Sequence, residues 1–166
     1  MLPDNQTYKF LQMHFHWRGS EHFIDGHRYS AELHLVHQNT QDENKFAVLG
    51  FLFEVINSYF ILHLLYFKFK FFKFKKKSNE DNKDLDLITE ALVQVSKFDT
   101  KHELQYNLAK LIPFDLYNYF RYPGSLTTPG CDEKVEWFVV SKPILKISED
   151  QLLAFQDLQD HNGYPV

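Results

Sequence analysis

The sequence predicts a β-rich α+β domain, on three observations. Residues 8–17 and 29–37 alternate apolar and polar residues, the pattern of strands with one buried face. Residues 46–55, "FAVLGFLFEV", form a nearly continuous apolar run, which is consistent with a strand buried on both faces. Residues 86–97 carry apolar residues at helical spacing. With 166 residues and a hydrophobic fraction of 44%, the chain is expected to form a single globular domain.

Turn and strand signals follow in chain order. Residues 18–27, "RGSEHFIDGH", contain two glycines and an Asp-Gly pair, which is typical of a hairpin turn. Residues 122–130, "YPGSLTTPG", contain two prolines and two glycines and predict a loop. Residues 135–140 and 143–147 predict two further strands.

Two helices are expected. The apolar residues at i, i+3, i+4 and i+7 that predict a helix over residues 86–97 are Ile88, Ala91, Leu92 and Val95. Ser148 and Gln151 have the spacing of a capping box, which predicts a second, short helix. The side chains expected to face inward from this helix are Leu152, Phe155 and Leu158.

Residues 56–77, "INSYFILHLLYFKFKFFKFKKK", differ in composition from the rest of the chain. A membrane span is not supported, because the uncharged run before Lys68 is shorter than the roughly 20 residues required. A basic amphipathic strand is an alternative, since phenylalanine and lysine alternate over residues 67–71. We favour a third interpretation, a translated intron, because these residue types are those that A/T-rich codons specify.

Charge and cysteine content limit the partners and leave the compartment open. The net charge of −4 and the pI of about 6.1 do not favour a nucleic-acid partner. The single cysteine, Cys131, excludes an internal disulfide. The first ten residues lack the features of a signal peptide, and Asn5 begins an isolated glycosylation sequon.

Six of the nine histidines lie between His14 and His37. Alternate residues of a strand share a face, so His14 and His16 point together and can meet His34 from the next strand. Three imidazoles leave the fourth position of a tetrahedral Zn²⁺ ion open, as in catalytic zinc sites. Imidazole also suits copper, nickel and iron.

The histidine ligands of a metal need acceptors that fix their orientation. Gln12 lies two residues before His14, and Glu32 lies two residues before His34, so either could bond the free ring nitrogen of a ligand. The remaining histidines of the cluster, His22, His27 and His37, are expected to have structural or surface roles.

Five separated motifs, "LQMHFHW", "GSEH", "YSAELHLVH", "FAVLGFLFEV" and "YPGSLTTP", resemble the α-class carbonic anhydrases, in the same order. The resemblance covers nearly everything outside residues 56–77. Joining Val55 to Ser78 gives a sequence similar to an uninterrupted member of the family. The resemblance implies a partial carbonic-anhydrase fold, with a central, twisted, mostly antiparallel sheet and peripheral helices, interrupted by the insert.

The resemblance also implies roles for individual residues. It assigns His14, His16 and His34 as zinc ligands and Gln12 and Glu32 as their hydrogen-bond partners. Thr127 matches the threonine that accepts a hydrogen bond from zinc-bound hydroxide and donates to a glutamate, here Glu21. The residues that match the lining of the carbon dioxide site are Val36, Val48, Leu126, Thr128, Val135 and Trp137.

The implied function is that of a zinc lyase, the reversible hydration of carbon dioxide to bicarbonate by zinc-bound hydroxide. The alternatives are a catalytically impaired, carbonic-anhydrase-like binding protein and a fragment without function. Non-catalytic, carbonic-anhydrase-like binding proteins typically lose a zinc histidine, and all three of these histidines are present here. The oligomeric state is left open.

Several features of the family do not appear in this sequence. The histidine that shuttles protons in many members lies in N-terminal sequence absent here, and so does the C-terminal strand whose carbonyl orients the second ligand, His16. The chain as written is therefore expected to be marginally stable. In secreted and membrane-attached members a cysteine after the "TTP" loop pairs with an N-terminal one, so Cys131 suggests an extracellular ancestor, while a cytoplasmic location stays open.

Overall fold

The computed structural model describes residues 6–55, 81–113 and 115–165. The chain divides into two compact units, residues 1–53 with 113–145 and residues 54–112 with 146–166. The unusual segment 56–77 lies outside the described residues, so its interpretation as a translated intron remains a hypothesis, as does the single-domain organisation.

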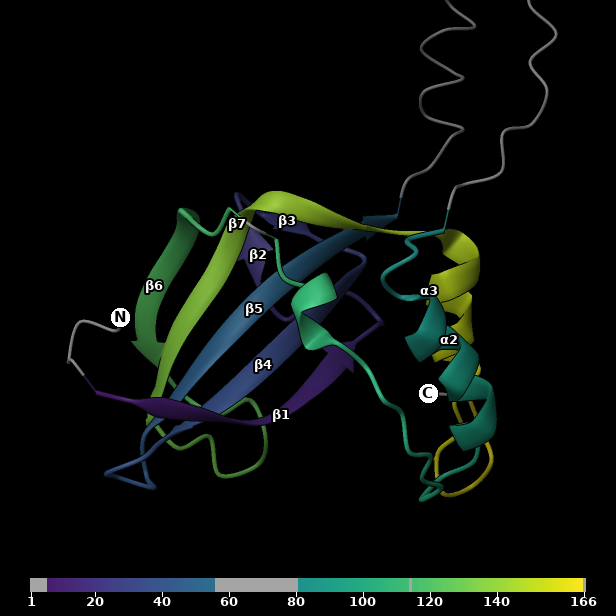
Figure 1. The fold of residues 1–166 in the computed structure, drawn as a ribbon, viewed down its shortest axis with the longest axis horizontal. Coiled ribbons are helices and arrows are strands. Elements are labelled where there is room, and N and C mark those ends of the chain that lie inside the picture. The colour runs from purple at the N-terminus through teal and green to yellow at the C-terminus, as the bar shows by residue number, and fades with distance from the viewer. Residues whose placement is uncertain (1–5, 56–80, 114, 166) are drawn as a thin grey trace, which may run out of the picture. The chain divides into compact units, whose positions relative to one another are not determined.

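The first unit contains a five-stranded sheet in the order β1-β4-β5-β7-β6 (Figure 1). The strands are β1 (Tyr8–His16), β4 (Ala31–Asn39), β5 (Phe46–Val55), β6 (Asn118–Gly124) and β7 (Val135–Ile147). The pairs β1/β4, β4/β5 and β6/β7 are antiparallel. Figure 1 shows β5 and β7 running in the same direction, so the sheet is mixed but mostly antiparallel. The predicted β-rich α+β class is confirmed.

The expected hairpin turn is present between the first two long strands. It consists of β2 (Phe23–Ile24) and β3 (His27–Arg28), which pair antiparallel around Asp25 and Gly26. Both turn residues have positive φ, 51° and 76°. Two consecutive left-handed residues define the turn type that matches the twist of a hairpin, and Asp-Gly is a preferred pair for it.

Strands β4 and β5 form the buried centre of the sheet. Strand β5 coincides with the predicted run 46–55, and Ala47, Val48 and Phe51 to Phe53 are at most 2% exposed. Strand β4 begins two residues after the predicted start at residue 29 and has six consecutive buried residues. Burial of consecutive residues means that both faces of these strands are covered, so the prediction of a single buried face for residues 29–37 is wrong. The two strands carry part of the site described below.

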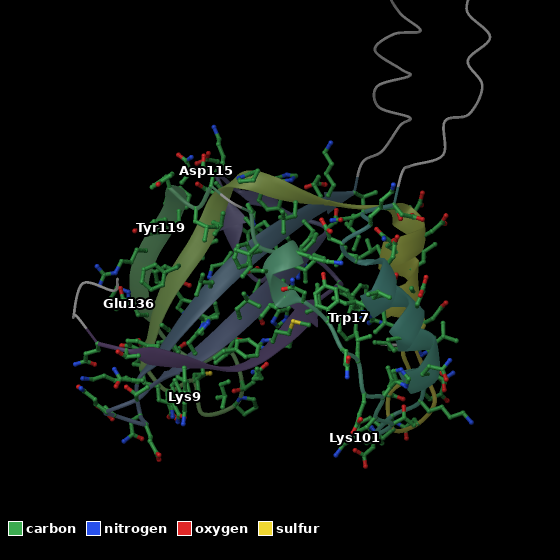
Figure 2. All side chains as sticks on the ribbon, viewed as in Figure 1. Lys9, Trp17, Lys101, Asp115, Tyr119 and Glu136 are labelled. Carbon is green, nitrogen blue, oxygen red and sulfur yellow. The ribbon has the colours of Figure 1, made fainter. Side chains whose placement is uncertain are left out.

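The C-terminal half of the sheet differs from the sequence prediction in two respects. Residues 122–124 were expected in a loop, but they complete β6. Pro123 is tolerated there because β6 is an edge strand, where a proline without an N–H need not remove a hydrogen bond of the sheet. In Figure 2 the labels Tyr119 and Glu136 mark β6 and its neighbour β7. The two strands predicted over residues 135–147 are one continuous strand, β7.

The second unit contains α2 (Asp86–Leu92), α3 (Glu149–Gln156) and two 3₁₀ turns, η1 (Val93–Val95) and η2 (Leu108–Lys110). The helix predicted over 86–97 ends as an α-helix at Leu92 and tightens into η1, a common ending. The predicted capping box is confirmed. The Ser148 side chain accepts a hydrogen bond from the Gln151 backbone N–H, and the Gln151 side chain accepts one from the Ser148 backbone N–H. Phe155 is buried, whereas Leu152 and Leu158 are half-buried. No helix in the described ranges is long and apolar enough to cross a membrane.

Candidate metal centre

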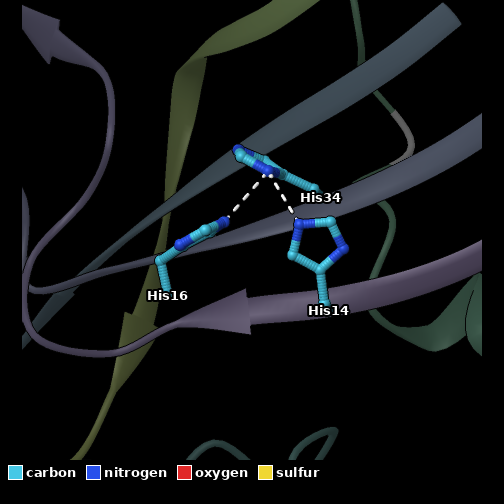
Figure 3. A group of neighbouring side chains, drawn as sticks. All are labelled: His14, His16 and His34. Atoms are coloured by element: carbon cyan, nitrogen blue, oxygen red, sulfur yellow. Dashed lines mark hydrogen bonds between the residues drawn. The ribbon is translucent and has the colours of Figure 1, made fainter. Parts of the chain in front are cut away.

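Strand register brings three histidines onto one face of the sheet. His14 of β1 lies directly opposite His34 of β4, and His16 lies opposite Glu32. Because cross-strand partners share a face and side chains alternate along each strand, all four side chains project to the same side. Figure 3 shows the three imidazole rings converging from the two strands.

The three imidazoles meet at a spacing that suits a metal ion. His34 Nδ1 lies 3.2 Å from His16 Nε2 and 3.3 Å from His14 Nε2. A tetrahedral zinc ion with bonds of 2.0–2.1 Å separates its nitrogen ligands by about 3.3 Å. His34 is buried, while His14 and His16 are half-buried, so one side of the cluster faces solvent. The residues present therefore fit a zinc ion with an accessible fourth position.

Two acceptors fix which ring nitrogens face the centre. Gln12 Oε1 lies 3.0 Å from His14 Nδ1, and Glu32 Oε1 lies 2.8 Å from His34 Nε2. In each pair the imidazole N–H donates to the oxygen, which leaves the other nitrogen of that ring with a free lone pair. These are the lone pairs of His14 Nε2 and His34 Nδ1 that point into the cluster.

Ionisation favours metal binding at neutral pH. Burial, followed by the neighbouring His34 and His16, lowers the pKa of His14 to about 4. Burial and His34 also lower the pKa of His16. Burial alone would raise the pKa of Glu32, but hydrogen bonds from His22 and His34 outweigh it and hold this pKa well below its usual range. The two imidazoles are therefore neutral at neutral pH and lie beside a negative carboxylate.

The sequence did not predict the contacts that His22 makes with Glu32 and Tyr122. Its Nδ1 lies 2.5 Å from Glu32 Oε1, its backbone N–H donates to Glu32 Oε2 at 2.9 Å, and its Nε2 lies 2.6 Å from the Tyr122 hydroxyl. His22 and Tyr122 are 100 residues apart, and Tyr122 lies on a strand that was not predicted. No local pattern could have revealed this contact.

Gly50 of β5 provides the space for the Glu32 carboxylate. It pairs directly with His34 and lies in the middle of the central strand. A Cβ atom at this position would lie 2.8 Å from Glu32 Oε1. Any other residue would therefore displace the acceptor that orients His34. In the sequence this glycine is simply one residue of an apolar run.

An apolar cluster lies beside the histidines. Its four buried members are at most 7% exposed: Val36, Val48, Val135 and Trp137. Phe46 and Leu126 are partly buried and pack against them. The Trp137 ring contacts the His34 ring with centroids 4.8 Å apart. The apolar residues that the resemblance assigns to the carbon dioxide site thus gather next to the candidate metal centre.

The predicted pairing of Thr127 and Glu21 is not formed. Both residues are exposed, and no hydrogen bond joins them in the described part of the chain. Glu21 Oε2 instead lies 3.5 Å from His16 Nε2, at the edge of the histidine cluster. Thr128 is also exposed, and its carbonyl accepts a hydrogen bond from the Cys131 backbone at 3.0 Å. The roles of the two threonines and of Glu21 remain predictions.

The other two histidines lie away from the cluster. His37 is on the opposite face of β4 from His34, and its Nδ1 lies 3.0 Å from the Leu35 carbonyl oxygen. His27 is exposed and packs edge-on against Tyr29. The structural or surface roles expected for these two histidines stay predictions.

Comparison with known sequences decides the family. The family described as eukaryotic-type carbonic anhydrase matches residues 1–165. The chain belongs to this family. Among its relatives, carbonic anhydrase 4 of Rattus norvegicus is 38% identical over 165 residues, which cover 89% of this chain and 46% of the relative. Putative carbonic anhydrase 3 of Caenorhabditis elegans is 32% identical, and the match covers 98% of this chain and 58% of the relative.

A solved structure gives the same assignment for the fold. An α-carbonic anhydrase from Thermovibrio ammonificans, determined with the inhibitor sulfanilamide, superimposes with a TM-score of 0.71 at 28% identity. The match covers 98% of this chain and 61% of that structure. This carbonic anhydrase chain therefore spans about half the length of the curated relatives that it matches.

Proposed function

We propose that this carbonic anhydrase chain binds zinc and carries the reversible hydration of carbon dioxide to bicarbonate. The observation that carries the proposal is the spacing of the imidazole nitrogens next to a buried apolar cluster. His16 Nε2 lies 3.2 Å and His14 Nε2 lies 3.3 Å from His34 Nδ1. Three imidazole nitrogen ligands beside an apolar wall suit the attack of a water-derived nucleophile on an uncharged substrate.

His14, His16 and His34 would hold the zinc ion. Zinc, when bound, supplies a Lewis acid that lowers the pKa of a coordinated water to about 7, a value known from carbonic anhydrase itself. Gln12 and Glu32 keep the lone pairs of His14 and His34 turned towards the ion. Glu32 is negative and accepts a hydrogen bond from the His34 ring, so it also increases the basicity of that ring.

The apolar cluster would bind carbon dioxide. The substrate has no charge and a weak hydrogen-bonding capacity, so it gains more from contact with Val48 and Trp137 than from a polar clamp. The same side chains pack against the sheet, and their burial holds the wall rigid. Val36, Val135 and Leu126 complete the surface beside the metal.

Thr127 and Glu21 would orient the attacking oxygen. If the Thr127 hydroxyl donates its proton to Glu21, it can act towards the nucleophile only as an acceptor, which turns a lone pair towards the substrate. Glu21 already lies at the histidine cluster, near His16. This role requires a hydrogen bond between Thr127 and Glu21, which is not formed among the described residues.

The alternative function is zinc binding without catalysis. It is favoured by the absence of a Thr127–Glu21 hydrogen bond within the described residues. A chain with the three ligands but without an oriented nucleophile would retain the metal and leave carbon dioxide hydration near the uncatalysed rate.

Metal analysis and stopped-flow carbon dioxide hydration on the purified chain separate the two. We expect one zinc per chain, loss of zinc in His34→Ala, and loss of rate with zinc retained in Thr127→Ala. Thr100→Ala is the control, because Thr100 belongs to the second unit and its exposed hydroxyl donates to the Lys97 carbonyl. Stoichiometric zinc without hydration would support the binding protein, and a chain that retains no zinc would contradict both.

A further inference from the structure

We propose that the Tyr122 hydroxyl is a positioning group for the metal ligand His34 and acts on it through His22 and Glu32. The inference rests on the zinc site proposed above and names a residue outside it that sets its geometry. Tyr122 is not one of the three histidines, and its ring stacks on Trp137 of the apolar cluster.

The contacts form one continuous series. The Tyr122 hydroxyl lies 2.6 Å from His22 Nε2, His22 Nδ1 lies 2.5 Å from Glu32 Oε1, and the same oxygen lies 2.8 Å from His34 Nε2. Glu32 is fully buried, and the His22 side chain is 17% exposed. All four residues belong to the first unit, on β4, β6 and the hairpin before β4.

With His22 neutral, the chemistry of the groups fixes the direction of every hydrogen bond in the series. A carboxylate only accepts, so His22 Nδ1 and His34 Nε2 must each carry a proton when they bond Glu32. A neutral imidazole with its proton on Nδ1 has a lone pair on Nε2, and the tyrosine hydroxyl donates to it. Tyr122 therefore selects the one tautomer of His22 that can donate to Glu32.

The other tautomer of His22 would disturb the metal ligand. With the proton on Nε2, the Nδ1 lone pair would face the Glu32 carboxylate at 2.5 Å, which is repulsive. The carboxylate would shift, and His34 Nε2–H, in a buried position, would lose the acceptor that it has among the described residues. His34 could then move its proton to Nδ1, the nitrogen that a metal needs free.

The Tyr122 ring is held so that its hydroxyl stays in place. It stacks on Trp137 with an interplanar angle of 10° and a centroid distance of 6.3 Å. Gly124 leaves room for it, because a Cβ atom there would lie 2.9 Å from Tyr122 Cε2. The ring position is therefore set by packing, and the hydroxyl can be removed without removing the stack.

The test compares Tyr122→Phe with the unmodified chain, and uses Tyr119→Phe as the matched control. Tyr119 lies on the same strand, is 48% exposed, and its hydroxyl has no hydrogen bond in the described ranges. Nitrogen-15 NMR of the histidine side chains in the metal-free chain reports the tautomer of His22. Competition with a zinc chelator reports the affinity of the site.

We expect a single Nδ1–H tautomer of His22 in the unmodified chain and in Tyr119→Phe, and a mixture in Tyr122→Phe. We expect zinc affinity to fall roughly 5-fold in Tyr122→Phe, less than the 10- to 100-fold typical of direct partners of a ligand. A pure Nδ1–H tautomer with unchanged affinity in Tyr122→Phe would overturn the proposal. An Nε2–H tautomer of His22 in the unmodified chain would also overturn it, and that measurement does not depend on the folding of a variant. A chain that binds no zinc but shows the tautomer shift would refute the proposed function alone.

Discussion

Replacing Gly50 with alanine should weaken the metal centre without touching a ligand. The new Cβ atom would lie 2.8 Å from Glu32 Oε1, whereas an ordinary contact of this kind is at least 3.4 Å. Glu32 must therefore move by about 0.6 Å, the difference between these distances. The carboxylate cannot simply swing away, because His22 and His34 hold it through three hydrogen bonds.

The size of the effect follows from that displacement. A shift of about 0.6 Å away from His34 lengthens the 2.8 Å bond to roughly 3.4 Å, beyond the normal range for N–H···O hydrogen bonds. Loss of a direct partner of a metal ligand typically reduces metal affinity 10- to 100-fold. This corresponds to about 1.4–2.7 kcal/mol of binding free energy.

Chelator competition on Gly50→Ala measures that affinity, with Ala47→Gly as the control. Ala47 also lies on β5 and is buried, but it faces the opposite side of the sheet, so a change of one methyl group there should alter stability without altering zinc affinity. Equal zinc affinity in Gly50→Ala and the unmodified chain would refute the argument that Gly50 makes room for Glu32.

Three further predictions concern the site and the second unit. Glu32→Gln should lower zinc affinity roughly 10- to 100-fold, measured by chelator competition, because the negative acceptor of His34 is lost; unchanged affinity would contradict this role. The metal-free chain should lose stability as pH falls from 6.5 towards 4, since the unfolded state takes up a proton at His14 near pH 6.5 and the folded state only near pH 4. Urea unfolding at pH 7 and pH 5 tests this, and equal midpoints would count against it. Ser148→Ala should cost about 1 kcal/mol of unfolding free energy through loss of the helix cap, with Ser141→Ala as the comparison.

The strands that carry the three proposed metal ligands could be predicted because their periodicity is strong. Strands β1 and β4 alternate clearly, and alternation alone places His14 and His16 on one face. The buried run of β5 was equally clear. Strand β6 was missed because Pro123 and Gly124 are loop signals, and only its position at the sheet edge makes them acceptable.

The partners of the site were harder to predict than its ligands. Gln12 and Glu32 lie two residues from the histidines they contact, so local spacing could suggest them. The contact between His22 and Tyr122 joins segments 100 residues apart, and it depends on the order of strands in the sheet. The requirement for glycine at position 50 depends on a side chain from the neighbouring strand. Neither leaves a periodic signal in the sequence.

The most direct test of the central claim is X-ray absorption spectroscopy of the zinc-loaded chain. The account predicts three imidazole nitrogens and one oxygen at about 2.0–2.1 Å from the metal. A sulfur ligand at about 2.3 Å, which only Cys131 or a methionine could supply, or fewer than three nitrogens would contradict it.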